Sequence, residues 1–479
     1  MCGADPRTHV LAALGERGMA EIAAGRSASS ADRFGKGYRA WFLGLMVVAS
    51  AVSVIDRTTI LTLSQPIKAD LHMTDADYGL LQGVGLALCY ALFGLPLARL
   101  ADTKNRMKLV AAAVGVFSIF ASFCGLVRTF VQLLLCRVVV GVGEAGVQPP
   151  IISAISDLYP AQKRGTALAI LSGNIGIGAL VGPVVAGRLA EKYSWRLMFF
   201  IVGVLGVAVA LLALLTTREP PRGMSDEVDV EHVPPPGFLA VLRLLAAKRS
   251  FWQVIFGMSV TNFAVAGIGT FVALYLTREF DLGPAMTGVV FGSVSFISTF
   301  GGTVSGGVIV DFVSRRDGRW YAWLPALGVL VAAPLYICGF LLPNAAVALV
   351  CLTVGGIALF FYYTPTQALL QNMVEPRMRA TAAFVFFVVS GLVGFGGGPA
   401  LLGFISDQVA AHAYAAGSYV TACPGGVAPH AAGAAAHTVC RLASLTGLKV
   451  AMSLMAGLYV WGAVHFFLAA KWVRQDLGQ

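Results

Sequence analysis

The chain has 479 residues, of which 57% are hydrophobic and only 12% are charged. Soluble domains carry about 25% charged residues, so this chain cannot cover its surface against water. Soluble enzymes, disordered proteins and disulfide scaffolds are therefore excluded. The formal net charge is +10. Its Lys and Arg residues fall in short segments between apolar runs and form no basic stripe, which excludes a nucleic-acid partner.

Motifs for bound cofactors are missing from the sequence. None of the eight cysteines forms a C-x-x-C pair, and the seven histidines show no metal-ligand spacing, so we expect no metal or other cofactor. No phosphate-binding G-x-x-x-x-G-K-[ST] motif occurs, which argues against an ATP-driven pump. Residues 1–37 lack an apolar core and predict a cytoplasmic tail, not a secretory signal.

Twelve stretches are long and apolar enough to cross a membrane as helices, which requires about 20 residues each. They lie at 41–66, 78–101, 106–127, 130–157, 164–190, 195–216, 250–277, 286–310, 320–342, 345–373, 380–410 and 448–472. A polar interruption divides them into two sets of six. The sequence predicts an all-α polytopic membrane protein with an N-terminal half at 38–217, a cytoplasmic linker at 218–249 and a C-terminal half at 250–479.

The distribution of Lys and Arg predicts the orientation of these helices. With the N-terminus inside, the tails and inside loops hold roughly three times as many basic residues as the outside loops. This bias predicts that both termini are cytoplasmic. We expect a monomer in the cell (inner) membrane, surrounded by membrane lipid.

The two halves repeat short motifs at a nearly constant offset. The pairs are Asp102…Arg106 and Asp311…Arg315, Lys163-Arg164 and Met378-Arg379, and Gly182-Pro183 and Gly398-Pro399. Several matches at nearly one offset indicate a six-helix unit that was duplicated in the same orientation.

Two six-helix halves resemble the major facilitator superfamily, and the resemblance extends from about residue 40. The segment from Asp102 to Arg106 resembles that superfamily's loop motif after helix 2, although Ala98 and Asn105 replace its usual glycines. Two further stretches, Arg137-Val-Val-Val-Gly-Val-Gly-Glu144 and Gly178 to Gly187, resemble its helix 4 motif and its antiporter motif in helix 5.

Three further segments resemble the Spinster branch of this superfamily. They are Ile55-Asp56-Arg57, the Gly-Val-Gly-Glu144-Ala run and Arg218-Glu-Pro-Pro-Arg-Gly. Eukaryotic members of the branch move lysophospholipids and sphingoid phosphates. The resemblance implies a secondary transporter that works by alternating access and is not an enzyme. A proton-gated channel and a receptor or intramembrane enzyme are the alternatives.

Four ionisable residues fall inside predicted spans, where charge is expensive and usually functional. Asp56 and Arg57 lie in helix 1, and Arg137 and Glu144 lie in helix 4. Helical spacing places Arg137, Glu144 and Gln148 on one face, and depth places Asp56 level with Arg137. We interpret Asp56 and Glu144 as proton carriers and Arg137 as the switch between them. A structural ion pair that fixes helix register is the alternative.

The second half carries amides and aromatic side chains where the first half carries charge. With Arg57 and Gln148 opposite, Asn262, Tyr363 and Gln367 predict a substrate site with a charged wall and an aromatic wall. Such a site fits a small amphipathic, lipid-like substrate that moves with protons. An organic anion or drug is the alternative substrate. For any one phenylalanine of that wall, a lipid-facing position is the alternative.

Two acidic residues, Asp102 and Asp311, follow equivalent helices beside Arg106 and Arg315. The repeat predicts that each carboxylate meets the N-terminus of a helix in the other half, whose dipole favours negative charge. The predicted gating contacts are Asp102 with helix 11 near Arg379, and Asp311 with helix 5 near Arg164. They would close the cytoplasmic side. Solvated loop charge is the alternative.

The predicted outside loop at 411–447 contains Cys423 and Cys440, 17 positions apart. An outside loop faces an oxidising compartment, so these two cysteines predict a disulfide.

Overall fold

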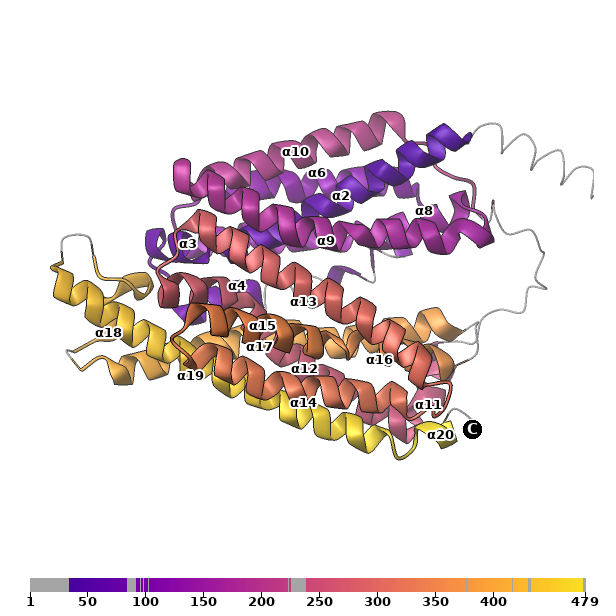
Figure 1. Ribbon diagram of the computed structural model, residues 1–479. Helices are drawn as coiled ribbons and strands as arrows, with labels where there is room; N and C mark the ends of the chain where they lie inside the picture. The colour runs from indigo at the N-terminus through magenta and orange to yellow at the C-terminus, as the bar shows by residue number, and fades with distance from the viewer. Residues whose placement is uncertain are drawn as a thin grey trace, which may run out of the picture.

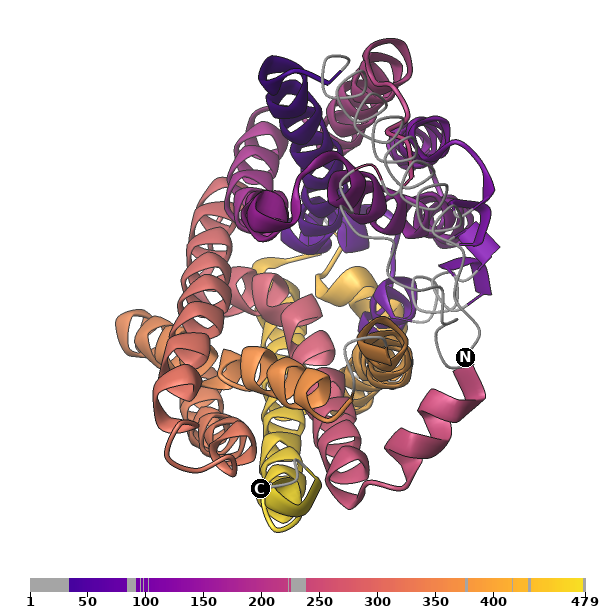
Figure 2. The same ribbon diagram turned by 90° about the vertical axis from the view of Figure 1, so that its right-hand side faces the viewer.

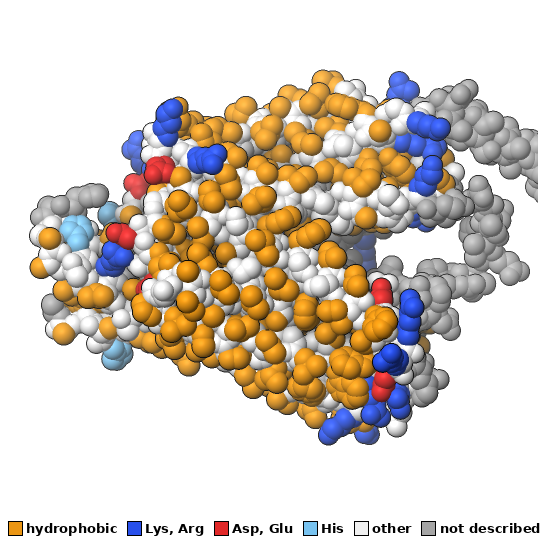
Figure 3. Space-filling view, viewed as in Figure 1, with side chains coloured by type: hydrophobic (Ala, Val, Ile, Leu, Met, Phe, Trp, Pro, Cys, Tyr) orange, Lys and Arg blue, Asp and Glu red, His pale blue; other side chains and the backbone are white. Residues whose placement is uncertain are grey.

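The computed structural model describes residues 34–83, 92–94, 96–97, 99–101, 103–222, 224, 238–374, 378–415, 417–429 and 432–476. Within these ranges the chain forms helices and no strands. The helices make two bundles that lie side by side (Figure 1). Hydrophobic side chains cover the middle of the visible surface, and charged side chains gather at its two ends (Figure 3). This pattern is typical of a protein that crosses a membrane several times.

The helices follow each other in chain order through the two bundles. The N-terminal bundle contains α2 (Lys36–Thr62), α3 (Ser64–Asp70), α4 (Asp75–Gln82), α6 (Arg106–Cys124), α7 (Phe130–Ala145), α8 (Gln148–Leu158), α9 (Ala161–Lys192) and α10 (Trp195–Thr216). The C-terminal bundle contains α11 (Phe238–Ala246), α12 (Arg249–Phe280), α13 (Pro284–Val313), α14 (Trp320–Leu341), α15 (Ala345–Phe360), α16 (Tyr363–Asn372), α17 (Arg379–Ala413), α19 (Ala434–Ala469) and α20 (Val473–Asp476).

Ten helices in the described ranges are long and apolar enough to cross a membrane. The two other predicted spans are 78–101, of which residues 84–91, 95 and 98 lie outside the description, and 380–410, which lies within α17. The predicted twelve-helix architecture agrees with this arrangement. The short helix α11 lies inside the stretch that the sequence predicts as a linker.

Two predicted spans are broken at equivalent positions in the two halves. The span at 130–157 divides where α7 ends at Ala145 and α8 begins at Gln148, and the span at 345–373 divides between α15 and α16. Proline lacks a backbone N–H and clashes with the preceding turn. Pro149 and Pro365 follow the two breaks and explain why both helices bend there.

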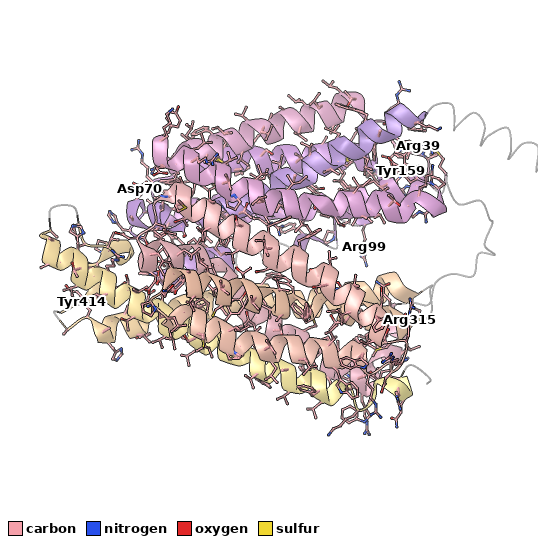
Figure 4. All side chains as sticks on the ribbon, in the orientation of Figure 1. Arg39, Asp70, Arg99, Tyr159, Arg315 and Tyr414 are labelled. Carbon is pink, nitrogen blue, oxygen red and sulfur yellow. A yellow bond between two sulfur atoms is a disulfide. The ribbon has the colours of Figure 1, made fainter. Side chains whose placement is uncertain are left out.

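The two bundles pack tightly at one end and separate at the other. We call the end with Asp70 and Tyr414 the closed end and the end with Arg99 and Arg315 the open end (Figure 4). Figure 2 views the two bundles from the open end, and Figure 3 shows a hollow between them there. Two helix pairs join the bundles: α4 of the N-terminal bundle packs on α17 of the C-terminal bundle, and α9 packs on α13 in the same way.

Glycines of the repeated motif make the close approach at the closed end possible. A Cβ atom on Gly187 would lie 2.2 Å from the Pro284 carbonyl oxygen, and one on Gly403 would lie 2.1 Å from the Asp75 carbonyl oxygen. Gly187 and Gly403 occupy equivalent positions of the two halves. Only glycine permits these helices to meet backbone to backbone.

The segment predicted as a long loop at 411–447 is mostly helical, which corrects the prediction. The helix α17 runs to Ala413, a short helix α18 follows at Tyr419–Ala422, and α19 already begins at Ala434. Alanine has the highest helix propensity, so the Ala434-Ala-Ala run extends the last helix beyond its apolar part. A disulfide joins Cys423 to Cys440 on α19, with 5.5 Å between their Cα atoms.

We expect Cys423 and Cys440 to react with a maleimide only after reduction of the denatured protein. Closing a loop of this size restricts the unfolded chain and stabilises the segment by about 3 kcal/mol. Peptide mapping after labelling with and without reductant measures the reactivity of each cysteine. Cys338 is exposed and unbridged, so it provides the control that labels in both conditions. Labelling of Cys423 without reductant would contradict the bridge.

Candidate functional site

Two ion pairs join α2 to α7 inside the N-terminal bundle. The Arg137 guanidinium donates through Nη1 to the Asp56 carboxylate. The Arg57 Nε donates to Glu144 Oε2 at 2.8 Å, with its Nη2 2.7 Å from the same oxygen. Ser53 Oγ donates to Glu144 Oε1 at 2.8 Å. The structure thus brings together all four charged residues that the sequence singled out, and it pairs Arg57 with Glu144.

The four charged residues differ in their access to the space between the bundles. Asp56, Glu144 and Arg137 are buried, whereas 41% of the Arg57 side chain is exposed. The Arg137 guanidinium also lies over the Phe199 ring, 5.1 Å from its centroid. Asp56 Oδ1 and the Nε and Nη2 atoms of Arg137 make no hydrogen bond to the described residues. Arg57 is therefore the most accessible of the four charged side chains.

A cavity of about 370 Å³ lies between the two bundles and is lined by both. The N-terminal bundle contributes charged and amide side chains, with Arg57, Arg137, Glu144 and Gln82 among them. The C-terminal bundle contributes apolar, aromatic and hydroxyl side chains from α12, α13, α14, α15, α17 and α19. The cavity therefore has one charged wall and one largely apolar wall, and the aromatic contribution includes Phe291, Phe360 and Phe395.

Four residues predicted to bind substrate are not among the residues that line the cavity: Gln148, Asn262, Tyr363 and Gln367. Asn262 instead accepts a hydrogen bond from the Tyr362 hydroxyl at 2.7 Å. Gln148 begins α8 and Tyr363 begins α16, so both follow a helix break. Spacing along a continuous helix does not hold across a break, so Gln148 and Tyr363 need not lie on the faces that it predicts. A role of these residues in substrate binding stays a prediction.

The predicted gating residue Arg106 lies inside the N-terminal bundle. Its guanidinium pairs with Asp157 and with Glu219, the latter at 2.6 Å, and it is buried. Arg106 therefore ties α6 to the end of α8 and to the segment after α10. It makes these contacts within one half.

The other predicted gating residues belong to the open end. Asp311 and Arg315 are exposed on α13 and directly after it, and Arg164 lies half-buried in the first turn of α9. Asp102 and the side chain of Arg379 lie outside the described residues. The bundles are apart at this end, and the predicted gating contacts stay a prediction.

The closed end carries a buried ion cluster that the sequence analysis missed. Asp75 on α4 accepts hydrogen bonds from both terminal nitrogens of Arg278 at 3.0 Å and from Ser406 Oγ at 2.7 Å. Lys68 also pairs with Asp75. Burial alone raises the pKa of the Asp75 carboxyl, but the Arg278 guanidinium and the Lys68 ammonium hold it below its usual range. Because Arg278 and Ser406 come from the C-terminal bundle, this cluster links the two bundles.

The Major Facilitator Superfamily model matches residues 45–399 of the chain. The chain belongs to the Major Facilitator Superfamily. Within it the chain is a Spinster-branch transporter, since a solved bacterial homologue of the human lysosomal transporter Spinster is 32% identical, with a TM-score of 0.85. That comparison covers 92% of this chain and 99% of the other, which was solved in an inward-facing and unoccupied conformation.

Two curated relatives carry names that describe transport. An MFS-type efflux pump of Mycolicibacterium smegmatis is 28% identical over 79% of this chain and 87% of its own length. A sphingosine-1-phosphate transporter of Xenopus tropicalis is 26% identical over 76% of this chain and 73% of its own length. The Spinster-branch transporter is thus a multi-pass membrane protein, and its relatives are transporters and not enzymes.

Proposed function

We propose that this transporter moves a lipid-like, anionic amphiphile together with protons, by alternating access to the cavity between its bundles. The observation that carries the proposal is the contrast between the cavity walls. The N-terminal wall presents Arg57 and Glu144, whereas the described lining residues of the C-terminal wall are all uncharged. A ligand with an anionic head and an apolar chain satisfies both walls. The sphingosine-1-phosphate transporter among its relatives supports this substrate class.

The proposal includes an orientation in the cell membrane. The bias of Lys and Arg supports a cytoplasmic location for both termini and the 218–249 linker. The first described residues of α2 and the last described residues of the chain lie at the open end (Figure 1). The open end then faces the cytoplasm, and the cavity is accessible from inside. In the other state the halves at 38–217 and 250–479 rock about the cavity and open the closed end.

Competition for Arg57 couples the substrate to protons in this proposal. Arg57 holds Glu144 in the state described here. An anionic head that binds Arg57 removes one counter-charge from Glu144, and a buried carboxylate without its cation takes up a proton. As α7 moves against α2, the Arg137 side chain leaves Asp56 and swings along its own helix toward Glu144. Asp56 and Glu144 are the proton carriers, and Arg137 is the switch.

Uptake of radiolabelled decyl phosphate into proteoliposomes tests the proposed function. We expect uptake that saturates with concentration, increases when a pH step is imposed and returns to the basal rate when a protonophore removes the step. Flux that never saturates would contradict a transporter with a binding site. Saturable uptake that ignores the pH step would contradict proton coupling.

A proton-coupled exporter of organic anions or drugs is the second candidate, favoured by the efflux pump among the relatives. Such a protein recognises compact aromatic anions without a long chain. Competition distinguishes the two candidates, because naphthoate should displace decyl phosphate poorly from a lipid transporter and well from a drug exporter.

In the Asp311→Asn variant, a larger fraction of molecules than in the wild type should have the open end open. In the state in which the open end has closed, the Asp311 carboxylate would meet the N-terminus of α9 near Arg164. This charge–dipole contact is worth up to about 2 kcal/mol. Its loss shifts the two-state equilibrium by up to about thirtyfold. The rate at which a maleimide added from the open end labels a cysteine at the cavity position Thr299 measures this shift.

A matched variant separates the gate from the general loss of a carboxylate. Asp317 lies in the same region and pairs with Arg474 of its own bundle at 2.9 Å. Asp317→Asn should leave the labelling rate unchanged. Equal rates for Asp311→Asn and the wild type would leave Asp311 as a solvated loop charge.

A further inference from the structure

We propose that the C-terminal wall of the cavity contains a second, neutral subsite that binds a hydroxyl group at the far end of the substrate. Tyr459, Tyr336 and Ser298 form it, and we call it the hydroxyl subsite. The inference rests on the proposed function, because it describes the other end of a ligand whose anionic head binds Arg57. The substrate is then an amphiphile with polar groups at both ends of its apolar chain.

Tyr459 has the strongest evidence for a missing hydrogen-bond partner. It lies on α19, is 0% exposed and lines the cavity. Its hydroxyl makes no hydrogen bond to the described residues. A buried hydroxyl without a partner costs free energy, so such groups are rare unless a ligand or water satisfies them. Its position at the cavity therefore points to a ligand that supplies the hydrogen bond.

Tyr336 packs beside Tyr459, and its hydroxyl lies near that of Ser298. The Tyr336 ring packs against the Tyr459 ring, with 5.8 Å between their centroids. A Cβ atom on Gly356 would lie 2.2 Å from Ser298 Oγ and 3.3 Å from Tyr336 Oη. Because residue 356 is glycine, both hydroxyls can approach the same point. The hydrogen bond of Ser298 to the Thr353 carbonyl is 3.4 Å long, so that hydroxyl is weakly engaged.

The chemistry of this wall selects a neutral partner. Every polar side chain that the described C-terminal bundle contributes to the cavity lining is a hydroxyl, from Thr270, Ser295, Ser298, Thr299, Tyr336 and Tyr459. Hydroxyls donate and accept hydrogen bonds but supply no charge to balance an ion. A ligand hydroxyl, which also donates and accepts, fits such a cluster, whereas a second charge would be buried without a counter-ion.

Two probes that differ only in the terminal group test the hydroxyl subsite. We would measure the Kd of decyl phosphate and of 10-hydroxydecyl phosphate for the purified full-length transporter by calorimetry. The quantity of interest is the ratio of the two Kd values. In Tyr459→Phe the preference for the hydroxylated probe should fall about tenfold relative to the wild type, as expected for one buried hydrogen bond. The variant removes only the hydroxyl, and decyl phosphate should bind it at least as tightly as it binds the wild type.

Tyr275→Phe is the matched control. Tyr275 is a buried tyrosine of the same bundle whose hydroxyl donates to the Gly339 carbonyl at 2.9 Å and which does not line the cavity. Its loss should leave the ratio of Kd values unchanged. A ratio that is equal in Tyr459→Phe and the wild type would overturn the hydroxyl subsite while leaving the proposed function intact. The proposed function itself fails if the wild type binds neither probe, or if Arg57→Ala binds both probes as tightly as the wild type does.

Discussion

Replacing Glu144 with glutamine is expected to abolish uptake driven by a pH step while decyl phosphate still binds. Glutamine keeps the shape of the side chain, and its one carbonyl oxygen can still accept from Arg57 while its amide nitrogen donates to Ser53 Oγ, but it cannot carry a proton. Accumulation should therefore fall to the level measured without a gradient. Binding should become no weaker, because the neutral side chain no longer competes with an anion for Arg57.

Three further variants test whether the effect of Glu144→Gln comes from proton carriage. Asp56→Asn should reduce the response to pH as well, because Asp56 is the second proposed carrier. Arg137→Ala should be more damaging, since it leaves Asp56 buried without its cation, which costs about 3–5 kcal/mol. Glu191→Gln is the control, because Glu191 is exposed on α9 outside the cavity lining and should retain wild-type uptake. Full pH-driven accumulation in both Glu144→Gln and Asp56→Asn would show that the cluster only fixes helix register.

The Asp75→Ala variant should loosen the closed end more than any other single substitution there. It leaves Arg278 and Lys68 with 4% and 1% of their side chains exposed and without the carboxylate that pairs them. Removing one partner of a buried ion cluster costs about 3–5 kcal/mol. We expect a lower melting temperature and faster maleimide labelling of cysteines introduced at the closed end. Asp70→Asn is the control, because Asp70 pairs with Arg196 within one bundle and is partly exposed, so its loss should change little.

The pH dependence of the Asp75 contact follows from the direction of its pKa shift. The folded protein holds the Asp75 pKa below its usual range. The contact therefore contributes its full stability above the ordinary pKa of an aspartate, and loses it as the pH falls through the lower folded value. The closed end should keep its stability between pH 5 and 8 as far as Asp75 is concerned. A melting temperature that falls steeply in this window in the wild type but not in Asp75→Asn would contradict this prediction.

Hydropathy and helical spacing were sufficient to predict the parts of the site that lie on unbroken helices. Asp56 and Arg137 lie at the same depth on neighbouring helices, and the structure pairs them. Gln148 and Tyr363 lie just beyond helix breaks, where a face predicted from continuous spacing is no longer valid. The charges of the four-residue cluster stood out because membrane spans rarely contain charge.

The closed-end cluster and the hydroxyl subsite were not predictable in the same way. Lys68, Asp75 and Arg278 fall at the ends of spans, where charge is ordinary and gives no signal of a partner in the other half. Tyr336 and Tyr459 lie on helices that only the tertiary packing brings to the cavity. Such contacts depend on how the two bundles meet, which no local pattern encodes.

Alternating access requires that the two ends of the molecule move in opposite directions. One pair of spin labels would join the exposed positions Arg99 and Arg315 across the open end, and the other would join His72 and Val420 across the closed end. The other unbridged cysteines would be replaced in both cases. On addition of decyl phosphate and a pH step, we expect the Arg99–Arg315 distance to shorten as the His72–Val420 distance lengthens. Distances at both ends that stay fixed, or that lengthen together, would contradict alternating access around the cavity.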